Sequence, residues 1–162
     1  MASRYTIRAI RETDDAPLAI IIRGSLKEFD ANLPGTVYYD DTTDHLTALF
    51  ATGNGKYFVL EKDGEVCGGA GYFATEGLDE DTCELVKMYL SPQHRGHGNG
   101  QALMNTCIDA ARTAGFRRMY IETLPMLQQA ISLYEKNGFT RIAEPLGQSG
   151  HTGCSVWMIK KI

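Results

Sequence analysis

A glycine-rich segment in the second half of the chain is the feature that most constrains the fold. Gly96, Gly98 and Gly100 alternate with polar residues. The hydrophobic pattern predicts a strand over residues 83–90 before them and a helix over residues 99–114 after them. Glycines allow successive backbone N–H groups to converge, and the N-terminus of the helix adds a partial positive charge. A strand, a glycine loop and a helix in this order are typical of an anion site, such as one for phosphate.

The spacing of the glycines narrows the choice of phosphate ligand. The dinucleotide motif G-x-G-x-x-G fails because Gln101 stands where its third glycine would be, and no G-K-[ST] of a P-loop follows. His94, Arg95 and His97 in the same loop can add charge or hydrogen bonds to a phosphate. The spacing of the two histidines does not indicate a metal pair, and we expect no metal site. A tight left-handed turn before a helix stays open as a purely structural explanation.

The order of the predicted elements indicates a mixed sheet covered by helices. A hairpin with its turn at Asp63 and Gly64 precedes alternating strands and helices, which predicts an α/β fold of mixed α+β character. We expect one domain over residues 1–162. The predicted strands cover residues 5–10, 57–61, 66–74, 83–90, 118–123, 139–142 and 155–159, and the predicted helices cover residues 13–29 (N-cap Thr13), 43–52, 99–114 and 125–136.

Composition excludes several classes of protein. Of the 162 residues, 43% are hydrophobic and 22% are charged, which indicates a globular chain rather than a disordered or fibrous one. The net charge of -4 disfavours nucleic-acid binding, and no apolar run approaches the roughly 18 residues of a membrane span. The N-terminus lacks the apolar segment of a signal peptide. We therefore expect a cytoplasmic protein with reduced, buried cysteines at Cys67, Cys83, Cys107 and Cys154.

A second pattern follows beyond the next predicted strand and makes the first more specific. The sequences QHRGHG (residues 93–98) and AISLYEKNGF (residues 130–139) resemble the blocks Q/R-x-x-G-x-G/A and A-x-x-L-Y-x-x-x-G-F of the GNAT superfamily of acyl-CoA-dependent N-acyltransferases. The segment ELVKMYLSP (residues 84–92) resembles the family's fourth strand. The resemblance spans about residues 56–142. It implies a single-domain GNAT-like fold, with a mixed sheet of about six to seven strands flanked by about four helices.

The resemblance also implies acetyl-CoA as the acyl donor and CoA as the product. Backbone N–H groups of residues 95–100 would hold the pyrophosphate, and the backbone of Met88 and Leu90 would pair with the pantetheine arm like an extra strand. Leu127 departs from the family, since many members have Asn there, and Gln129 is expected to replace that amide. The implied cofactor-binding residues are Met88, Tyr89, Leu90, Gln93, His94, Arg95, Gly96, His97, Gly98, Asn99, Gly100, Gln101 and Gln129.

Two side chains are the predicted catalytic groups. A primary amine has a pKa near 10.4 and arrives protonated; Glu84 is the first candidate for the base that deprotonates it, with Glu122 or a water relay as alternatives. Strand alternation places Glu84 on one face with Val86 and Met88. Tyr134 resembles the family's general acid, which stabilises the leaving thiolate. A solvated glutamate at the start of a strand and a packed tyrosine are the structural alternatives.

The function implied is an N-acetyltransferase that moves the acetyl group of acetyl-CoA directly to a primary amine of a small molecule or protein. A non-catalytic acyl-CoA-binding module of the same fold is the alternative, and a nucleotide-dependent enzyme is a third. We expect residues 24–45 and 143–153 to select the acceptor. The acid-rich stretch at residues 40–44 is either a solvated cap or an attraction for a cationic acceptor. Relatives are often dimers, so a homodimer is also considered.

Overall fold

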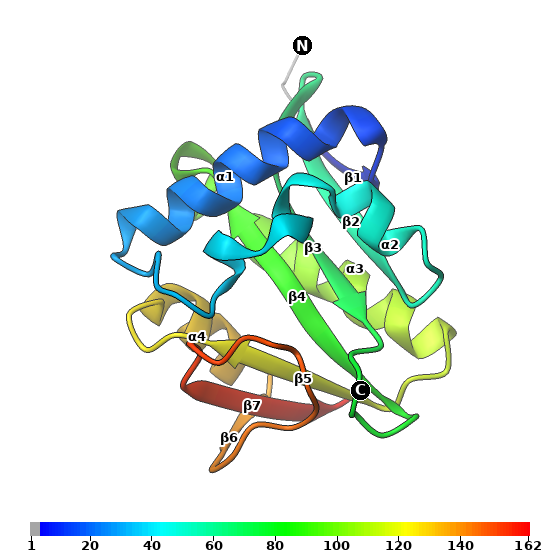
Figure 1. Ribbon diagram of the computed structural model, residues 1–162. Helices are drawn as coiled ribbons and strands as arrows, with labels where there is room; N and C mark the ends of the chain where they lie inside the picture. The colour runs from blue at the N-terminus through cyan, green and yellow to red at the C-terminus, as the bar shows by residue number, and fades with distance from the viewer. Residues whose placement is uncertain (1–3) are drawn as a thin grey trace.

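A seven-stranded sheet in the order β1-β2-β3-β4-β5-β7-β6 forms the centre of the molecule (Figure 1). The computed structural model describes residues 4–162. The strands are β1 (Tyr5–Ala9), β2 (Gly55–Lys62), β3 (Glu65–Phe73), β4 (Thr82–Leu90), β5 (Arg118–Thr123), β6 (Thr140–Ile142) and β7 (Val156–Lys161). The helices are α1 (Asp15–Glu28), α2 (Leu46–Phe50), α3 (Asn99–Thr113) and α4 (Gln128–Lys136), with 3₁₀ helices η1 (Glu12–Asp14), η2 (Val37–Tyr39), η3 (Asp41–Asp44) and η4 (Pro92–His94). The predicted fold class is confirmed.

The helices cover both faces of the sheet. α1 and α2 pack on one face, and α3 and α4 pack on the other (Figure 1). α1 buries Leu18, Ile22 and Leu26, whose four-residue spacing aligns them along one side of the helix. α3 buries Leu103 and Cys107 at the same spacing. The two apolar layers hold β4 between them and thereby fix the position of its C-terminal end.

β4 and β5 are parallel neighbours that pair over only a short stretch. Thr82–Glu84 of β4 opposes Arg118–Tyr120 of β5. Beyond this stretch the described residues of the two strands do not pair, and the strands diverge (Figure 1). The backbone of residues 85–90 therefore has no strand beside it on the β5 side. An open edge of this kind can accept an extended ligand as an additional strand.

A β-bulge at Lys87 interrupts the alternation of side chains along β4. Lys87 and Met88 together oppose Ala70 of β3, and Lys87 has a positive φ of 51°. The extra residue shifts the side-chain pattern by one position. Val86 consequently packs in the core beneath α1, whereas Met88 packs in the core beneath α3. The prediction that Glu84 and Met88 share a face is therefore wrong.

The first two predicted helices begin or end differently in the structure. Thr13 was expected to cap the first helix, but it lies within η1, and Asp14 precedes α1. The Asp14 carboxylate accepts hydrogen bonds from the Arg8 guanidinium at 2.8 and 2.9 Å, so an ion pair anchors this helix start. The predicted helix over residues 43–52 is split into η3 and α2, because His45 between them has a non-helical φ of -137°.

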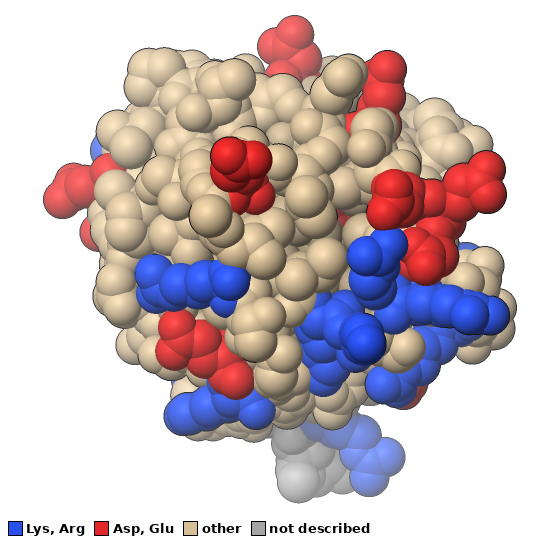
Figure 2. Space-filling model, turned by 90° about the horizontal axis from the view of Figure 1, so that it is seen from below, with Lys and Arg blue, Asp and Glu red and all other residues tan. Residues whose placement is uncertain are grey.

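The surface carries charges of both signs. Figure 2 shows Lys and Arg side chains gathered on one part of the face seen from below, with Asp and Glu side chains directly beside them. Neighbouring charges of opposite sign weaken the field that each would produce alone. No helix within residues 4–162 has the length and apolar character needed to cross a membrane.

Candidate functional site

The divergence of β4 and β5 opens a cleft of about 560 Å³, within the rough range of 300–1,000 Å³ for small-molecule sites. Its walls come from the second half of β4, the end of β5, the loop that leads into α3, and α4. It is lined by Ser25, Phe29, Leu85, Lys87, Met88, Tyr89, Leu90, Arg95, Gly96, Gly98, Asn99, Gly100, Gln101, Ile121, Glu122, Thr123, Leu127, Gln128, Gln129, Ala130, Ser132, Leu133, Tyr134 and Lys136. The cleft therefore joins the two sequence blocks that carry the resemblance.

The glycine loop presents backbone rather than side chains to the cleft. Gly96 and Gly98 have positive φ values of 76° and 77°, a conformation that glycine adopts without strain. A Cβ added at either residue would meet no atom within 4 Å, so the space beside this backbone is open. Gly98 precedes α3 and provides no side-chain cap. The N–H groups of the first turn of α3 are thus available to an anion.

Arg95 lines the cleft, but its side chain is committed to holding the loop. Its guanidinium donates hydrogen bonds to the Leu90 carbonyl at 2.9 Å, to a Glu28 carboxylate oxygen at 2.9 Å and to the Ser25 hydroxyl at 3.2 Å. These bonds tie the end of β4 to α1. The Arg95 charge therefore has a partner already, and the side chain serves the loop conformation more directly than it serves a free phosphate.

The cleft includes most of the predicted cofactor-binding residues but not Gln93, His94 and His97. The His94 ring is buried and lies 3.0 Å from the Tyr5 hydroxyl through Nδ1. Its carbonyl accepts a hydrogen bond of 3.0 Å from the Asn99 side chain. The side chains of His94 and His97, expected to add charge or hydrogen bonds to a phosphate, do not line the cleft. His94 instead braces the turn that precedes the helix.

Tyr134 lies on α4 and lines the opposite wall of the cleft. It is buried, and its ring packs edge-on against Phe139 with a centroid distance of 5.9 Å. Burial raises the pKa of the Tyr134 phenol above its ordinary value, so the hydroxyl keeps its proton at neutral pH. Gln129, on the first turn of the same helix, also lines the cleft, and so does Leu127.

A smaller recess of about 50 Å³ adjoins the cleft and includes Leu26 of α1 in its lining. The two cavities share Leu85, Lys87, Tyr89, Glu122, Thr123 and Leu127. Glu84 lines the recess but not the cleft. Only 3% of its surface is exposed. Burial raises the pKa of Glu84 from 4.5 to about 7; a hydrogen bond of 2.8 Å from the Thr75 hydroxyl opposes this shift, and the charge of Glu122 adds to it. Glu84 is therefore a carboxyl group that exchanges its proton near neutral pH.

Glu122, the alternative base, lies on β5 and borders both cavities. Ser149 donates hydrogen bonds that reach both carboxylate oxygens, at 2.9 and 2.8 Å. The Tyr120 hydroxyl also lies 3.1 Å from one of these oxygens. Glu122 is consequently held by donors at both oxygens, whereas among the described residues Glu84 has a side-chain donor at one oxygen only.

Two loops far apart in the sequence close over the recess. Asp40, between η2 and η3, lies 2.6 Å from Nε2 of His151, in the loop between β6 and β7. The backbone N–H of Gly153 donates to the Gly35 carbonyl at 2.9 Å, which joins the same two loops. Lys87 reaches Asp40 with an N–O distance of 3.7 Å. These loops belong to the segments expected to select the acceptor, but neither Lys87 nor Ser149 is among the site residues predicted from the sequence.

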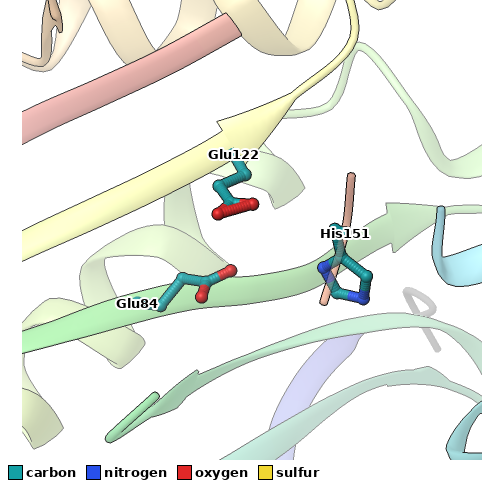
Figure 3. A group of neighbouring side chains, drawn as sticks. All are labelled: Glu84, Glu122 and His151. Atoms are coloured by element: carbon teal, nitrogen blue, oxygen red, sulfur yellow. The ribbon is translucent and has the colours of Figure 1, made fainter. Parts of the chain in front are cut away.

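Glu84, Glu122 and His151 come together although they stand on three separate segments (Figure 3). One carboxylate oxygen from each glutamate and one ring nitrogen of His151 lie within 4.8 Å of one another. Glu84 and Glu122 are the alternative bases predicted from the sequence, and His151 belongs to residues 143–153, which are expected to select the acceptor. The structure brings both carboxyl groups and this histidine into one cluster.

Comparison with known proteins gives consistent matches. The model of the acetyltransferase (GNAT) family matches residues 25–139. An uncharacterized N-acetyltransferase of Escherichia coli K12, YjgM, is 36% identical over 157 residues, which cover 96% of this chain and 94% of that protein. A probable N-acetyltransferase of Mus musculus, family 8 member 5, is 32% identical over 126 residues, covering 76% of this chain but about half (53%) of the mouse protein.

Solved structures share the fold at low sequence identity. A GNAT-family acetyltransferase of Staphylococcus aureus Mu50 has a TM-score of 0.83 at 16% identity, over 98% of this chain and 99% of that one. The PaiA N-acetyltransferase of Thermoplasma acidophilum, solved with coenzyme A, has a TM-score of 0.77 at 18% identity, over 98% and 99% of the two chains. At such identities these structures establish the fold alone.

Proposed function

Because this chain belongs to the GNAT family of acetyltransferases, we propose that it transfers the acetyl group of acetyl-CoA directly to a primary amine of a small molecule or protein. The chain is an acyltransferase, in keeping with the family match and with the names of its relatives. The amine acceptor and the roles of individual residues belong to the proposal. The observation that carries it is that a cleft bordered by the glycine loop shares wall residues with a recess that holds a buried carboxyl group with a pKa of about 7.

The donor half of the cleft fits acetyl-CoA. In the proposal, the N–H groups of residues 96–100 and the first turn of α3 bind the pyrophosphate. The unpaired edge of β4 lies beside the pantetheine arm and hydrogen-bonds it as an extra strand would. An N–H group near the bulge at Lys87 then faces the thioester carbonyl, and such a donor is worth about 3 kcal/mol to the transition state.

The acceptor half supplies the base. An alkyl ammonium with a pKa near 10.4 must lose a proton before its nitrogen can attack the thioester. Glu84 is proposed as the base because burial places its pKa at about 7, close to the working pH at which a general base is most effective. Glu122 is proposed as its neighbour in the site, since its carboxylate already accepts the Ser149 hydroxyl, which lies 2.9 and 2.8 Å from the two oxygens.

The departing thiolate needs a donor. Tyr134 is proposed for this role because it borders the cleft from α4 and its phenol stays protonated. A raised phenol pKa makes complete proton transfer to the thiolate more uphill than it would be for an ordinary tyrosine. Tyr134 is therefore proposed to stabilise the developing negative charge mainly as a hydrogen-bond donor.

A thiol-release assay tests the proposal. The protein is incubated with acetyl-CoA and a panel of polyamines, amino acids, aminoglycosides and peptides, and free CoA is measured against a blank without amine. Binding of CoA is measured separately by calorimetry. Amine-dependent release for at least one class is expected. Tight CoA binding without release for any amine would contradict the proposal and would favour a non-catalytic acyl-CoA-binding module.

A further inference from the structure

The cluster of Glu84, Glu122 and His151 has the geometry of a site for a single small cation. Its three contact atoms lie within 4.8 Å of one another. The centre of a triangle of that size is no more than about 2.8 Å from each corner, which is a normal hydrogen-bond distance. Figure 3 shows the two carboxyl groups and the imidazole turned toward a common space. One atom placed there reaches all three groups at once.

Asp40 determines which atom His151 offers to this space. The Asp40 carboxylate lies 2.6 Å from Nε2, so Nε2 carries the hydrogen in a neutral ring and Nδ1 keeps its lone pair. Nδ1 is then the ring nitrogen that faces the two carboxyl groups (Figure 3). The His151 side chain is 13% exposed. The cluster thus presents three hydrogen-bond acceptors, two on carboxylates and one on an imidazole.

The surroundings leave room for a further donor at both carboxylates: among the described residues one Glu84 oxygen has no side-chain donor, and a Glu122 oxygen that accepts from Ser149 keeps a second lone pair. Glu84 receives a side-chain hydrogen bond only at Oε1, from Thr75, among the described residues, although it is almost entirely buried. Asp40 and Lys87 lie beside the cluster and offset each other's charge at 3.7 Å. Cys154 also borders the recess, and burial raises the pKa of its thiol to about 12, so it stays neutral. A net negative charge remains at the two glutamates.

We propose that Glu84, Glu122 and His151 accept the three N–H bonds of a primary ammonium group, so that the acceptor is an unhindered primary amine. The inference rests on the proposed function, because it assigns the acceptor side of the same site. An ammonium group has three donors and no acceptor, which matches the cluster one to one. A secondary ammonium leaves one acceptor without a donor, and a quaternary ammonium leaves all three. The recess of about 50 Å³ has an apolar wall that includes Leu26 and Val37, which suits a slender alkyl chain.

Histidine-ring NMR tests the inference without any turnover. The ¹⁵N-labelled protein is saturated with CoA at pH 8, and the His151 ring nitrogens are assigned with His151→Gln. Propylammonium chloride is added, and propyltrimethylammonium chloride at equal ionic strength is the matched control. Propylammonium is expected to shift the Nδ1 resonance in a saturable way, and the quaternary ion is expected to leave it unchanged. An equal response to both ions, or none to propylammonium, would overturn the proposal.

Variants sharpen the same titration. Glu122→Gln is expected to weaken the apparent propylammonium affinity at least tenfold, while Glu80→Gln, at an exposed turn residue, leaves it unchanged. Thermal unfolding and CoA affinity verify that both variants fold. Tight ZnCl₂ binding that shifts the same resonances and that propylammonium cannot reverse would overturn the proposal in favour of a metal site. Selective binding without thiol release would support this cluster while contradicting the proposed transfer reaction.

Discussion

The cleft and the recess are built from different kinds of chemical groups. One wall of the cleft comes from residues close together in sequence, 88–90, 95, 96 and 98–101, and includes glycines at positive φ where the chain turns into α3. The recess offers side chains from β4, β5 and two loops. Backbone groups are the same in every residue, so only the spacing of small residues is needed to expose them. Side-chain recognition depends on which distant segments meet.

This difference predicts which region tolerates substitution. In the proposal, the glycine loop binds the pyrophosphate through backbone N–H groups, so substitutions nearby are tolerated as long as the backbone conformation is preserved. The recess loses a specific acceptor atom with each substitution at Glu84, Glu122 or His151. We therefore expect substitutions in the cleft to change donor affinity, and substitutions in the recess to change turnover and acceptor affinity.

Glu84→Gln is expected to produce the largest effect and tests whether turnover and CoA affinity depend on different regions. Removing the base is expected to lower kcat roughly 10²–10⁴-fold and to leave the CoA affinity within about twofold, because Glu84 does not line the cleft. In the unmodified protein, kcat/KM is expected to rise with pH up to about 7, since Glu84 with a pKa of about 7 must be deprotonated to act.

Steady-state kinetics at pH 6 to 9 measures both effects. Glu80→Gln is the control, because it makes the same substitution at an exposed turn residue. Full activity in Glu84→Gln would move the role of the base to Glu122 or to a water relay. A large loss of CoA affinity would contradict the separation of the two cavities.

Tyr134→Phe tests the boundary between the two regions. Loss of one hydrogen bond to a charged thiolate is expected to lower kcat roughly 10–100-fold, with a smaller change in the KM for acetyl-CoA. The phenyl ring keeps its packing on Phe139. Tyr72→Phe is the matched control, since Tyr72 is a second buried tyrosine, packed on Phe116. Unchanged turnover in Tyr134→Phe would remove the hydroxyl from the mechanism.

Gly98→Val tests the cleft alone. A Cβ here points into open space, where the proposal puts the pyrophosphate, so CoA affinity is expected to fall roughly tenfold or more. Gly115→Val carries the same backbone penalty, because Gly115 also has a positive φ and open space around it, at the far end of α3. Isothermal titration with CoA compares the two variants. Equal affinities in both would show that the Gly98 backbone does not contact the coenzyme.

The elements that border the cleft could be predicted from the sequence, because the motifs that indicate them are short and local. Alternating glycines between a strand and a helix, and the block that ends at Phe139, predicted the fold class and the elements that border the cleft. The bulge at Lys87 lies opposite Ala70, between Gly69 and Gly71 of β3; no residue in β4 itself marks it, because it depends on the pairing of β4 with β3. Local propensity predicts a helix cap at Thr13. It does not describe the ion pair between Arg8 and Asp14, which anchors the start of the helix one residue later.

The recess could be predicted only in part. Glu84 and Glu122 stand on predicted strands; Glu84 pairs with Tyr120, and Glu122 lies two residues farther along β5, on the same face of the sheet. Asp40 and His151 are 111 residues apart, and no local pattern brings two such loops together. The same holds for Ser149, whose hydroxyl fixes Glu122. Contacts between loops are decided by the whole fold, which explains why the acceptor side had a predicted region but not a predicted geometry.

The smallest expected effect is a gain of stability in Glu84→Gln. Glu84 has a pKa of about 7 in the folded chain against an ordinary 4.5, so the folded state binds its proton more tightly than the unfolded state does. The free energy of unfolding is then expected to fall as the pH rises from 4.5 to 7 and to stay level above 7. Glutamine resembles the protonated form and removes this loss.

Thermal unfolding at pH 4.5 and pH 8 measures the difference. The two proteins are expected to unfold at similar temperatures at pH 4.5, and the variant is expected to be more stable by roughly 1–3 kcal/mol, or a few degrees in Tm, at pH 8. Gly98→Val is expected to show no such pH-dependent gain, because no titrating group is replaced. A variant that matches the unmodified protein at pH 4.5 but is less stable at pH 8 would mean that His151 and Lys87 stabilise the buried carboxylate more than burial penalises it, which would contradict the raised pKa of Glu84.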